Sequence, residues 1–368
     1  MKKKNLCKTL VKTICIVLGI LILALLAYIV YLYASYYRIE DNQELVVEAP
    51  VDDTATGAAA VLATDTKYSA VTYNIGFGAY LPDYSFFMDG GTSSWAESPE
   101  TVQYAINGAG ELVKSLDPDF ALIQEIDLDA TRSYHTDEYE MLRNLLPEYT
   151  TVFAQNYDSA FLFYPFTQPH GSSRAGLGLF SKYPVSSALR RSFPISTSFS
   201  KFFDLDRCYS VSRIPVDNGR ELVIFNLHMS AYGNSDAIRK GQIEMLCNDM
   251  AKEYEAGNYV LCGGDFNHDL KASEEDAENC ESWAFPFPRT ELPEHFAFCL
   301  DLLSSEEKES LWNSARNADM EYVPGVTYTV TLDGFIISDN IECLSYENVN
   351  TGYSYSDHDP VKMEFVLK

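Results

Sequence analysis

The chain beyond residue 66 alternates between short apolar runs and segments whose apolar residues recur at helical spacing. Short runs rich in Val, Ile, Leu, Tyr and Phe, bounded by Gly, Pro, Asn or Asp, are typical of β-strands. Such runs lie at 68–76, 120–125, 151–156, 176–185, 207–216, 221–228, 259–267, 327–337 and 360–367. Between two of these runs stands Asn218-Gly219, which predicts a hairpin turn.

Three segments of this part of the chain predict helices. The first begins at Ser98-Pro99-Glu100, which supplies an N-cap, a proline in the first turn and an acid facing the helix dipole, and it stops before Asp117-Pro118. The others cover about 137–146 and 236–256. Strands in series, with helices between some of them, indicate two packed sheets flanked by helices. We therefore predict an α+β protein.

The amino-terminal segment predicts a membrane anchor. No charged residue occurs in residues 13–37, and an apolar helix of this length crosses a hydrocarbon core of ~30 Å. All the basic residues of positions 1–12 precede it and several acids follow it, so the positive-inside rule places residues 1–12 in the cytoplasm and the rest outside. A cleaved signal peptide is the alternative. Its apolar core would be shorter, about 7–15 residues, and would end in an A-x-A-like site that this sequence lacks.

Residues 38–66 consist mainly of small and acidic residues without hydrophobic periodicity. This composition predicts a flexible spacer that tethers a catalytic domain over 67–368. Six cysteines follow the anchor, none in a CxxC or Cys/His spacing that indicates zinc. Their even number permits disulfides in an exported domain, and Cys280 with Cys299 is the pairing that we favour.

Charge narrows the range of partners. The formal net charge is −26, and no cluster of Lys and Arg occurs beyond residue 12. Because neutralised phosphates supply most non-specific affinity for nucleic acids, this composition argues against a protein that tracks along DNA or RNA. A bound cation and a local basic pocket can still handle one phosphodiester. The aromatic segments 76–98 and 161–166 either contact lipid or bases or pack within the fold.

Polar clusters lie at one end of six of the apolar runs. Because strand ends from distant parts of a sequence meet at one rim of a sheet, a rigid scaffold can hold a metal and a substrate there. Taken singly, each cluster is also compatible with a turn or a solvated side chain. The six clusters are YN at 73–74, QE at 124–125, NLH at 226–228, GGDFN at 263–267, LDGF at 332–335 and SDHDP at 356–360.

In this order the clusters resemble the endonuclease/exonuclease/phosphatase, or DNase I-like, superfamily. The resemblance covers about 68–368 and implies a four-layer α/β/β/α sandwich with a Mg²⁺-dependent hydrolytic site at one edge. Mg²⁺ prefers oxygen ligands and is commonly held by one or two carboxylates plus substrate phosphate, and Mn²⁺ is an alternative. The resemblance implies that Asn74, Glu125 and Asp357 hold the metal.

The resemblance also implies roles for other residues. His358, oriented by Asp333, takes a proton from water or stabilises the transition state, and Asp265 positions or deprotonates the water. Asn267 donates to a non-bridging oxygen, whereas His228 contacts phosphate or acts as the acid near the leaving oxygen. Arg174 is either a phosphate clamp or a surface arginine.

Two positions depart from the pattern of relatives. Some relatives carry an acidic residue where this chain has Gly76, and many carry a residue other than aspartate at the position of Asp359, after His358. Together these features predict a metal-dependent phosphoesterase on the outer side of a membrane, with no obligate protein partner. Its substrate is a nucleic acid, a phospholipid head group or another envelope phosphoester. The alternative is an inactive adaptor on the same fold, which would lack residues such as Glu125, Asp265 and Asn267. All of them are present.

Overall fold

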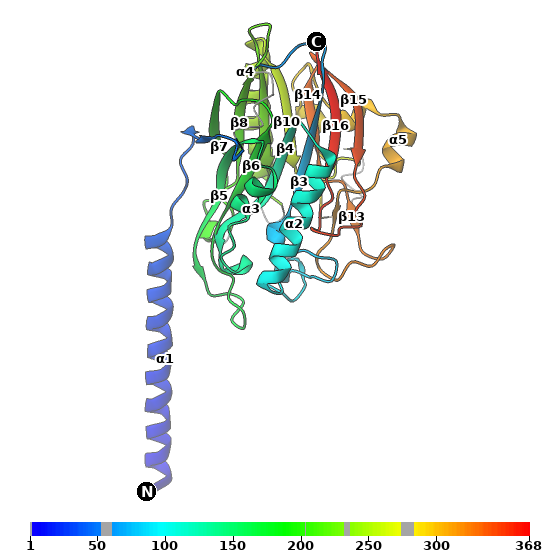
Figure 1. The fold of residues 1–368 in the computed structure, drawn as a ribbon. Helices are drawn as coiled ribbons and strands as arrows, with labels where there is room; N and C mark the ends of the chain where they lie inside the picture. Colours follow the sequence, from blue (N-terminus) through cyan, green and yellow to red (C-terminus); the bar gives the residue numbers. More distant parts are fainter. Residues whose placement is uncertain (1, 53–60, 203, 232–235, 274–282) are drawn as a thin grey trace. The chain divides into compact units, whose positions relative to one another are not determined.

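The computed structural model describes residues 2–52, 61–202, 204–231, 236–273 and 283–368. The chain divides into two compact units, Met1–Arg38 and Ile39–Lys368. In the first unit, helix α1 spans Lys2–Ser35 (Figure 1). Its segment Cys7–Ser35 has a mean hydropathy of 3.0 and is long and apolar enough to cross a membrane. The length and composition of α1 agree with the predicted anchor, and they equally fit a signal sequence.

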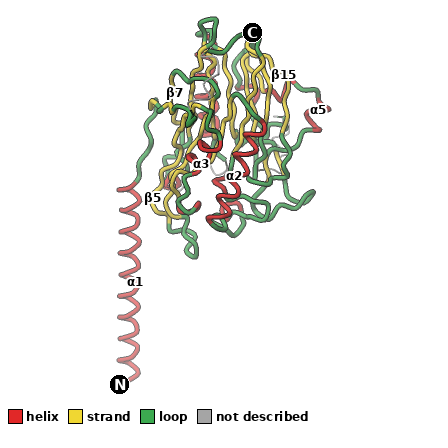
Figure 2. Tube along the Cα trace, in the orientation of Figure 1, coloured by secondary structure: helices red, strands yellow, loops and turns green. Residues whose placement is uncertain are grey.

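The second unit contains two large mixed β-sheets (Figures 1 and 2). In spatial order, the first sheet consists of β1 (Gln43–Glu44), β7 (Ser187–Ser192), β8 (Cys208–Pro215), β9 (Glu221–His228), β10 (Tyr259–Asp265), β14 (Asp333–Ser338) and β11 (Phe296–Phe298). The second consists of β15 (Ile341–Asn348), β16 (Val361–Leu367), β3 (Lys67–Asn74), β4 (Phe120–Ala130), β6 (Gly171–Ser181), β5 (Thr150–Leu162) and β2 (Val47–Glu48). A small sheet pairs β12 (Ala315–Arg316) with β13 (Thr329–Val330).

Helices cover the outer faces of the two large sheets. Helices α2 (Pro99–Leu116) and α3 (Glu138–Leu145) pack on the second sheet, where Val102 and Leu142 join a core that includes Ile123. Helix α4 (Asp236–Glu255) packs on the first sheet, and α5 (Ser305–Ser310) is a short peripheral helix. Between the sheets, residues such as Leu122 and Phe225 form the main core. The result is the predicted α/β/β/α sandwich.

Helix α2 and the hairpin between β8 and β9 form where local sequence features predicted them. The Ser98 hydroxyl caps α2 by accepting a hydrogen bond from the backbone N–H of Thr101 at 3.1 Å. The helix ends where Asp117 adopts a left-handed conformation, with φ at 48°. At the hairpin between β8 and β9, Gly219 has φ at 82°, which this tight turn requires.

The described parts of residues 38–66 differ from the predicted flexible spacer. Strand β1 pairs with β7, and β2 pairs with β5. Ile39 and Leu62 are buried. Backbone pairing at two sheet edges and burial of these apolar side chains attach the segment to the sandwich, and composition alone did not reveal either. Residues 53–60 of the predicted spacer lie outside the described residues.

The predicted pairing of Cys280 with Cys299 cannot be placed, because Cys280 lies outside the described residues. Cys299 is a buried free thiol in the short helix η8 (Cys299–Leu302). Its Sγ lies 3.3 Å from Sδ of Met363. The pairing therefore stays a prediction.

Candidate active site

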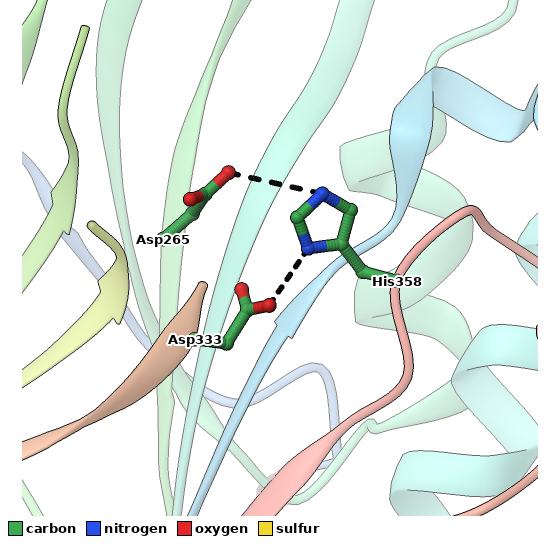
Figure 3. A group of neighbouring side chains, drawn as sticks. All are labelled: Asp265, Asp333 and His358. Atoms are coloured by element: carbon green, nitrogen blue, oxygen red, sulfur yellow. Dashed lines mark hydrogen bonds and ion pairs between the residues drawn. The ribbon is translucent and has the colours of Figure 1, made fainter. Parts of the chain in front are cut away.

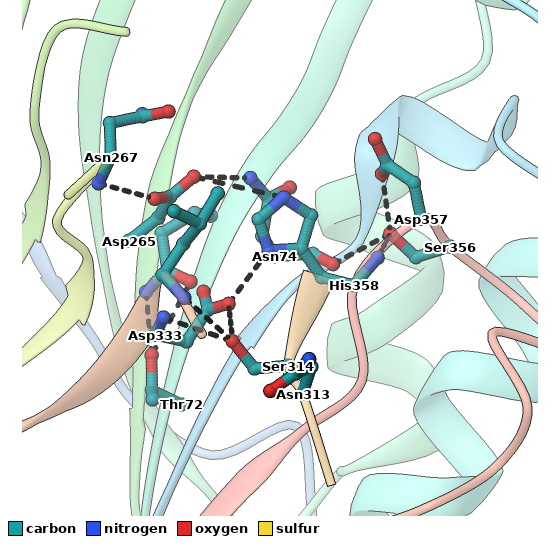
Figure 4. A network of polar contacts seen from close by, with 12 residues as sticks. Thr72, Asn74, Asp265, Asn267, Asn313, Ser314, Asp333, Ser356, Asp357 and His358 are labelled. Atoms are coloured by element: carbon teal, nitrogen blue, oxygen red, sulfur yellow. Dashed lines mark hydrogen bonds and ion pairs between the residues drawn. The ribbon is translucent and has the colours of Figure 1, made fainter. Parts of the chain in front are cut away.

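Strand pairing brings the predicted polar clusters to one rim of the sandwich. Asp265 ends β10, directly opposite His228 at the end of β9 and Asp333 at the start of β14. In the facing sheet, Asn74 ends β3 beside Gln124 of β4. The two sheets therefore present their polar ends to a common region, and Figure 4 shows much of the resulting network.

His358 lies between two carboxylates at this rim (Figure 3). Its Nδ1 lies 2.7 Å from Oδ2 of Asp333, and its Nε2 lies 3.9 Å from Oδ2 of Asp265. Asp333 is itself fixed by the Ser314 hydroxyl, which donates to the same Oδ2 at 2.7 Å. Both ends of the Asp333–His358 pair are buried, so the imidazole is held with Nε2 directed toward Asp265.

Asn74 connects the sheets through its side-chain amide. As its amide is oriented, Nδ2 donates to Oε1 of Glu125 and to Oδ2 of Asp265, both at 3.1 Å. Its Oδ1 accepts from the backbone N–H of Gly76 at 3.0 Å. In this orientation Asn74 acts as a donor that sets the spacing of two carboxylates, and its role as a metal ligand stays a prediction.

Glu125 stands at an irregularity in β4. The pairing register of β4 with β6 shifts between Ile123 and Ile126, and Glu125 between them has φ at 56°. A bulge of this kind redirects a side chain, and a non-glycine residue in the left-handed region is held there by the surrounding structure. Its carboxylate is partly exposed, lining the same cavity as Asp265. A strand-end pattern cannot reveal this bulge.

His228 and Asn267 complete the surroundings of Asp265. His228 Nε2 lies 3.5 Å from Oδ2 of Asp265 and 3.9 Å from Oε1 of Glu125. The backbone N–H of Asn267 donates to Oδ1 of Asp265 at 2.8 Å, while the Asn267 side chain donates to the carbonyl of Met229 at 2.9 Å. Oδ1 of Asp265 is thus fixed by a backbone hydrogen bond, and Oδ2 faces the side chains of Asn74, His228 and His358.

Asp357 takes the space that an acidic residue at position 76 would need. A Cβ on Gly76 would come within 2.7 Å of the Tyr80 ring and 3.2 Å of Oδ1 of Asp357, and Gly76 has φ at 55°. The Ser356 hydroxyl donates to Oδ1 of Asp357 at 3.3 Å. The departure at position 76 therefore coincides with a close approach of Asp357 that only glycine permits.

The two histidines have opposite electrostatic surroundings. Burial opposes a charged imidazole at His358, yet the neighbouring carboxylates, led by Asp333, raise its pKa well above the usual range. Burial, reinforced by Arg207, lowers the pKa of His228 well below that range. Burial raises the pKa of Asp265 to about 7, against the opposing effect of His358. The imidazole of His358 therefore favours the charged form and that of His228 the neutral form, and both rings lie beside Asp265.

A cavity of about 510 Å³ opens over these groups. Its lining includes six of the predicted residues, and Asp333 lies behind His358. The six are Glu125, His228, Asp265, Asn267, Asp357 and His358. Four other lining residues, Phe77, Tyr80, Phe86 and Asp89, belong to the aromatic segment 76–98 that the sequence indicated. Among those that the sequence did not single out are the arginines Arg132, Arg207 and Arg316, with Tyr157 and His170.

Two positions noted in the sequence lie away from the cavity. Arg174 is 53% exposed and pairs with Asp129 at 2.9 Å, so the structure does not bring it to the predicted site. Asp359 is buried and accepts hydrogen bonds from the indole of Trp312 at 2.8 Å and from the backbone of Thr351 at 3.2 Å. It organises the loop before His358, which accounts for a carboxylate at this position.

Carboxylate oxygens at the rim fit a hard divalent cation. Ligand atoms of Asp265, Asp333 and His358 lie within 4.8 Å of one another. However, Oδ2 of Asp333 already accepts from Ser314 and faces His358 Nδ1, so these groups form a positioned pair rather than an open ligand set. Glu125 and Asp357 line the cavity and are the more suitable oxygen donors.

Comparison with known proteins identifies the family. Residues 71–302 match the Endonuclease/Exonuclease/phosphatase family, which is more than half of the chain. The chain belongs to this family, and the resemblance of its motif order is confirmed. The family comprises hydrolases of phosphoester bonds, and the chain is accordingly assigned to that class of enzyme. None of the curated proteins compared with the chain matches it.

Solved structures share the fold at low sequence identity. An endonuclease/exonuclease/phosphatase from Beutenbergia cavernae DSM 12333 is 15% identical with a TM-score of 0.54, covering 82% of this chain and 72% of the other. TDP2 of D. rerio, complexed with single strand DNA product, is 14% identical with a TM-score of 0.54, covering 82% and 99%. The human Nocturnin catalytic domain with bound sulfate anion is 17% identical with a TM-score of 0.53, covering 82% and 95%.

Proposed function

We propose that this protein hydrolyses a phosphodiester or phosphomonoester bond with the help of Mg²⁺, on the outer side of the membrane. One observation carries the proposal. Glu125 from the bulge in β4, Asp265 and Asp333 from two strand ends, and Asp357 and His358 from the loop before β16 converge on one cavity. Independent turns or solvated side chains would not gather these five groups at one cavity, with His358 bonded to Asp333 and Asn74 bridging Glu125 and Asp265.

The proposed chemistry begins with water beside Asp265. Oδ1 of Asp265 is fixed by the backbone of Asn267, and Oδ2 faces the cavity side of His358 and His228. Asp265 takes a proton as the water oxygen bonds to phosphorus, and the phosphorus–oxygen bond to the leaving group breaks. The leaving oxygen then gains a proton from solvent in the cavity, while His228, which burial keeps neutral, contacts the phosphoryl group from its position beside Asp265.

His358 stabilises the charge that builds on the phosphoryl oxygens. Asp333 accepts from Nδ1, so Nε2 is directed at the space beside Asp265 where those oxygens would lie. Asn267 lines the same space with an amide of which one N–H is already committed to Met229. Asn74 sets the separation of Glu125 and Asp265.

Glu125 and Asp357 are the proposed holders of Mg²⁺, with Mn²⁺ as a substitute. Both are carboxylates that line the cavity, and oxygen ligands of this kind suit Mg²⁺. When bound, the cation polarises the phosphoryl oxygen and neutralises charge on the leaving group. Asn74 would orient these ligands through its hydrogen bond to Glu125.

The membrane arrangement is part of the same proposal. Residues 1–12 lie in the cytoplasm, 13–37 cross the membrane, and the catalytic unit, which begins at Ile39 in the structure, lies outside. A carboxyl-terminal epitope should therefore be accessible to antibody on intact cells. Labelling only after permeabilisation would place the catalytic unit inside and overturn this part of the proposal.

The catalytic roles can be tested by substitution in the full chain, purified in detergent. Hydrolysis of DNA, RNA, sphingomyelin, inositol phosphates and bis(p-nitrophenyl) phosphate would first identify a usable substrate. Asp265→Asn and His358→Ala should then each lower kcat by at least about 10²-fold, as expected for groups that handle protons. Arg174→Gln, outside the cavity, should leave kcat unchanged. Wild-type rates in either site variant would refute the assigned roles.

A further inference from the structure

Of the three arginines that line the cavity, Arg207 has the least complete set of hydrogen bonds. Arg207 is only 7% exposed and lines the cavity. Its Nε and Nη1 atoms are buried and have no hydrogen-bond partner in the described part of the chain. Its closest recorded carboxylate contact is with Oδ1 of Asp204, at 4.0 Å from Nε, which is beyond hydrogen-bond distance. Leaving buried donors of a charged group unpaired is costly, about 1–3 kcal/mol each or more.

The other two cavity arginines have more of their donors paired within the protein. Arg132 donates from Nε and Nη2 to the two oxygens of buried Asp127, at 3.0 and 2.8 Å. Arg316 donates from Nη1 to the carbonyl of Asn317 at 3.0 Å and from Nη2 to that of Leu81 at 2.9 Å. The Nε of Arg316 is also buried without a partner, but both of its terminal nitrogens are bound, whereas Arg207 leaves both Nε and Nη1 unpaired.

The position of Arg207 is next to the reaction groups. It directly precedes β8, and Tyr209 of β8 pairs with Leu227 of β9, one residue before His228. Arg207 is also the strongest charged influence on the pKa of His228, after burial. The guanidinium thus stands at the sheet edge that carries His228 and Asp265. A phosphoryl group placed beside Asp265 would find these donors close by.

A second buried group on the cavity wall also lacks a partner. Nδ1 of His170 has none in the described residues, and the ring is only 6% exposed. Two independent side chains of the cavity wall are therefore built with unmet hydrogen-bonding capacity. This is what a wall shaped to receive a polar ligand requires, because buried polar groups are otherwise paired.

We propose that Arg207 binds a non-bridging phosphoryl oxygen of the substrate and so positions the phosphate beside His228 and Asp265. This inference rests on the proposed function for the identity of the substrate. A planar guanidinium with two free N–H groups matches the geometry of a phosphate and forms strong charge-assisted hydrogen bonds. The ligand class is a compact phosphate ester, since the surrounding chain is strongly acidic and lacks a basic track.

The test is calorimetric titration of the full chain in detergent with inorganic phosphate, in the presence of EDTA. Under these conditions neither turnover nor a metal contributes, so the result is independent of whether the protein is a hydrolase. Arg207→Gln should weaken phosphate binding at least about tenfold relative to wild type. Arg207→Lys should restore part of the affinity, because it keeps the charge without the planar fork. Arg174→Gln should bind like wild type.

Two outcomes would overturn the inference. One is that wild type binds no phosphate, which would mean that water alone meets the donors of Arg207. The other is that Arg207→Gln binds phosphate as tightly as wild type. Thermal unfolding of each variant shows whether it is folded. If the glutamine variant does not fold, Arg207→Lys takes its place, and phosphate affinity equal to that of wild type in the folded lysine variant contradicts the proposal.

Discussion

Replacing Arg190 with methionine is expected to destabilise the catalytic unit strongly. Arg190 has 0% exposure and lies in β7. Its Nε donates to the carbonyl of Gln155 at 2.7 Å, Nη2 donates to that of Asp206 at 2.9 Å, and Nη1 donates to that of Glu40 at 3.2 Å. The guanidinium therefore joins β5, β7 and the chain that follows the anchor.

The magnitude follows from these three contacts. A hydrogen bond from a charged donor contributes about 1.5–3 kcal/mol, and each carbonyl left buried without a donor loses that contribution. Methionine fills most of the volume and recovers some apolar burial, which offsets part of the loss. Removing one partner from such a buried network typically costs about 3–5 kcal/mol, and we expect a decrease in the free energy of unfolding within that range.

Urea unfolding of the full chain in detergent, followed by tryptophan fluorescence, measures this quantity. All three tryptophans lie beyond the anchor, so the signal reports on the catalytic unit. Arg174→Met is the matched control, because Arg174 is 53% exposed and its ion pair with Asp129 is screened by solvent. A loss below about 1 kcal/mol in Arg190→Met, similar to the control, would refute the reasoning that this network secures the segment.

Two further substitutions test other parts of the structure. Gly76→Ala should lower both stability and turnover, because the new Cβ would meet the ring of Tyr80 and crowd Asp357. The control is Gly325→Ala, because Gly325 has a similar φ of 75° and its new Cβ would lie in open space. Equal losses of turnover in the two variants, measured with any usable substrate, would contradict this explanation. Burial lowers the pKa of His170 to about 3, so below pH 6.5 the unfolded chain binds a proton that the folded chain does not, and stability falls as pH falls. Between pH 7 and 4.5, urea unfolding should show wild type losing about 2–3 kcal/mol more than His170→Gln; parallel pH profiles would show that His170 is not held neutral.

Much of the fold was predictable because its signals are local. Alternating strand patterns, the Ser98 cap and the Asn218-Gly219 turn each act within a few residues, and the structure contains the expected elements. Strands β1 and β2 were not predictable in this way. Each has only two residues and depends on a distant partner strand, so no periodic pattern marks it.

The candidate site was predictable to the extent that strand ends converge. Asp265, His228 and Asp333 are brought together by direct strand pairing, which a pattern of apolar runs ending in polar residues can indicate. The bulge that aims Glu125 has no sequence signature. Arg207 resembles any other arginine near an acidic residue, and only its buried, unpaired nitrogen atoms distinguish it from Arg174.

The central claim is that these side chains form one cation-dependent hydrolytic centre. It is tested most directly by removing metal from the full chain with EDTA and measuring turnover as Mg²⁺ is added back, for wild type and for Glu125→Gln. We predict no turnover without metal, recovery in wild type, and a requirement for at least about tenfold more Mg²⁺ in the variant, equivalent to about 1.4 kcal/mol. Undiminished turnover of the metal-free wild type, or the same Mg²⁺ dependence in both proteins, would contradict the account.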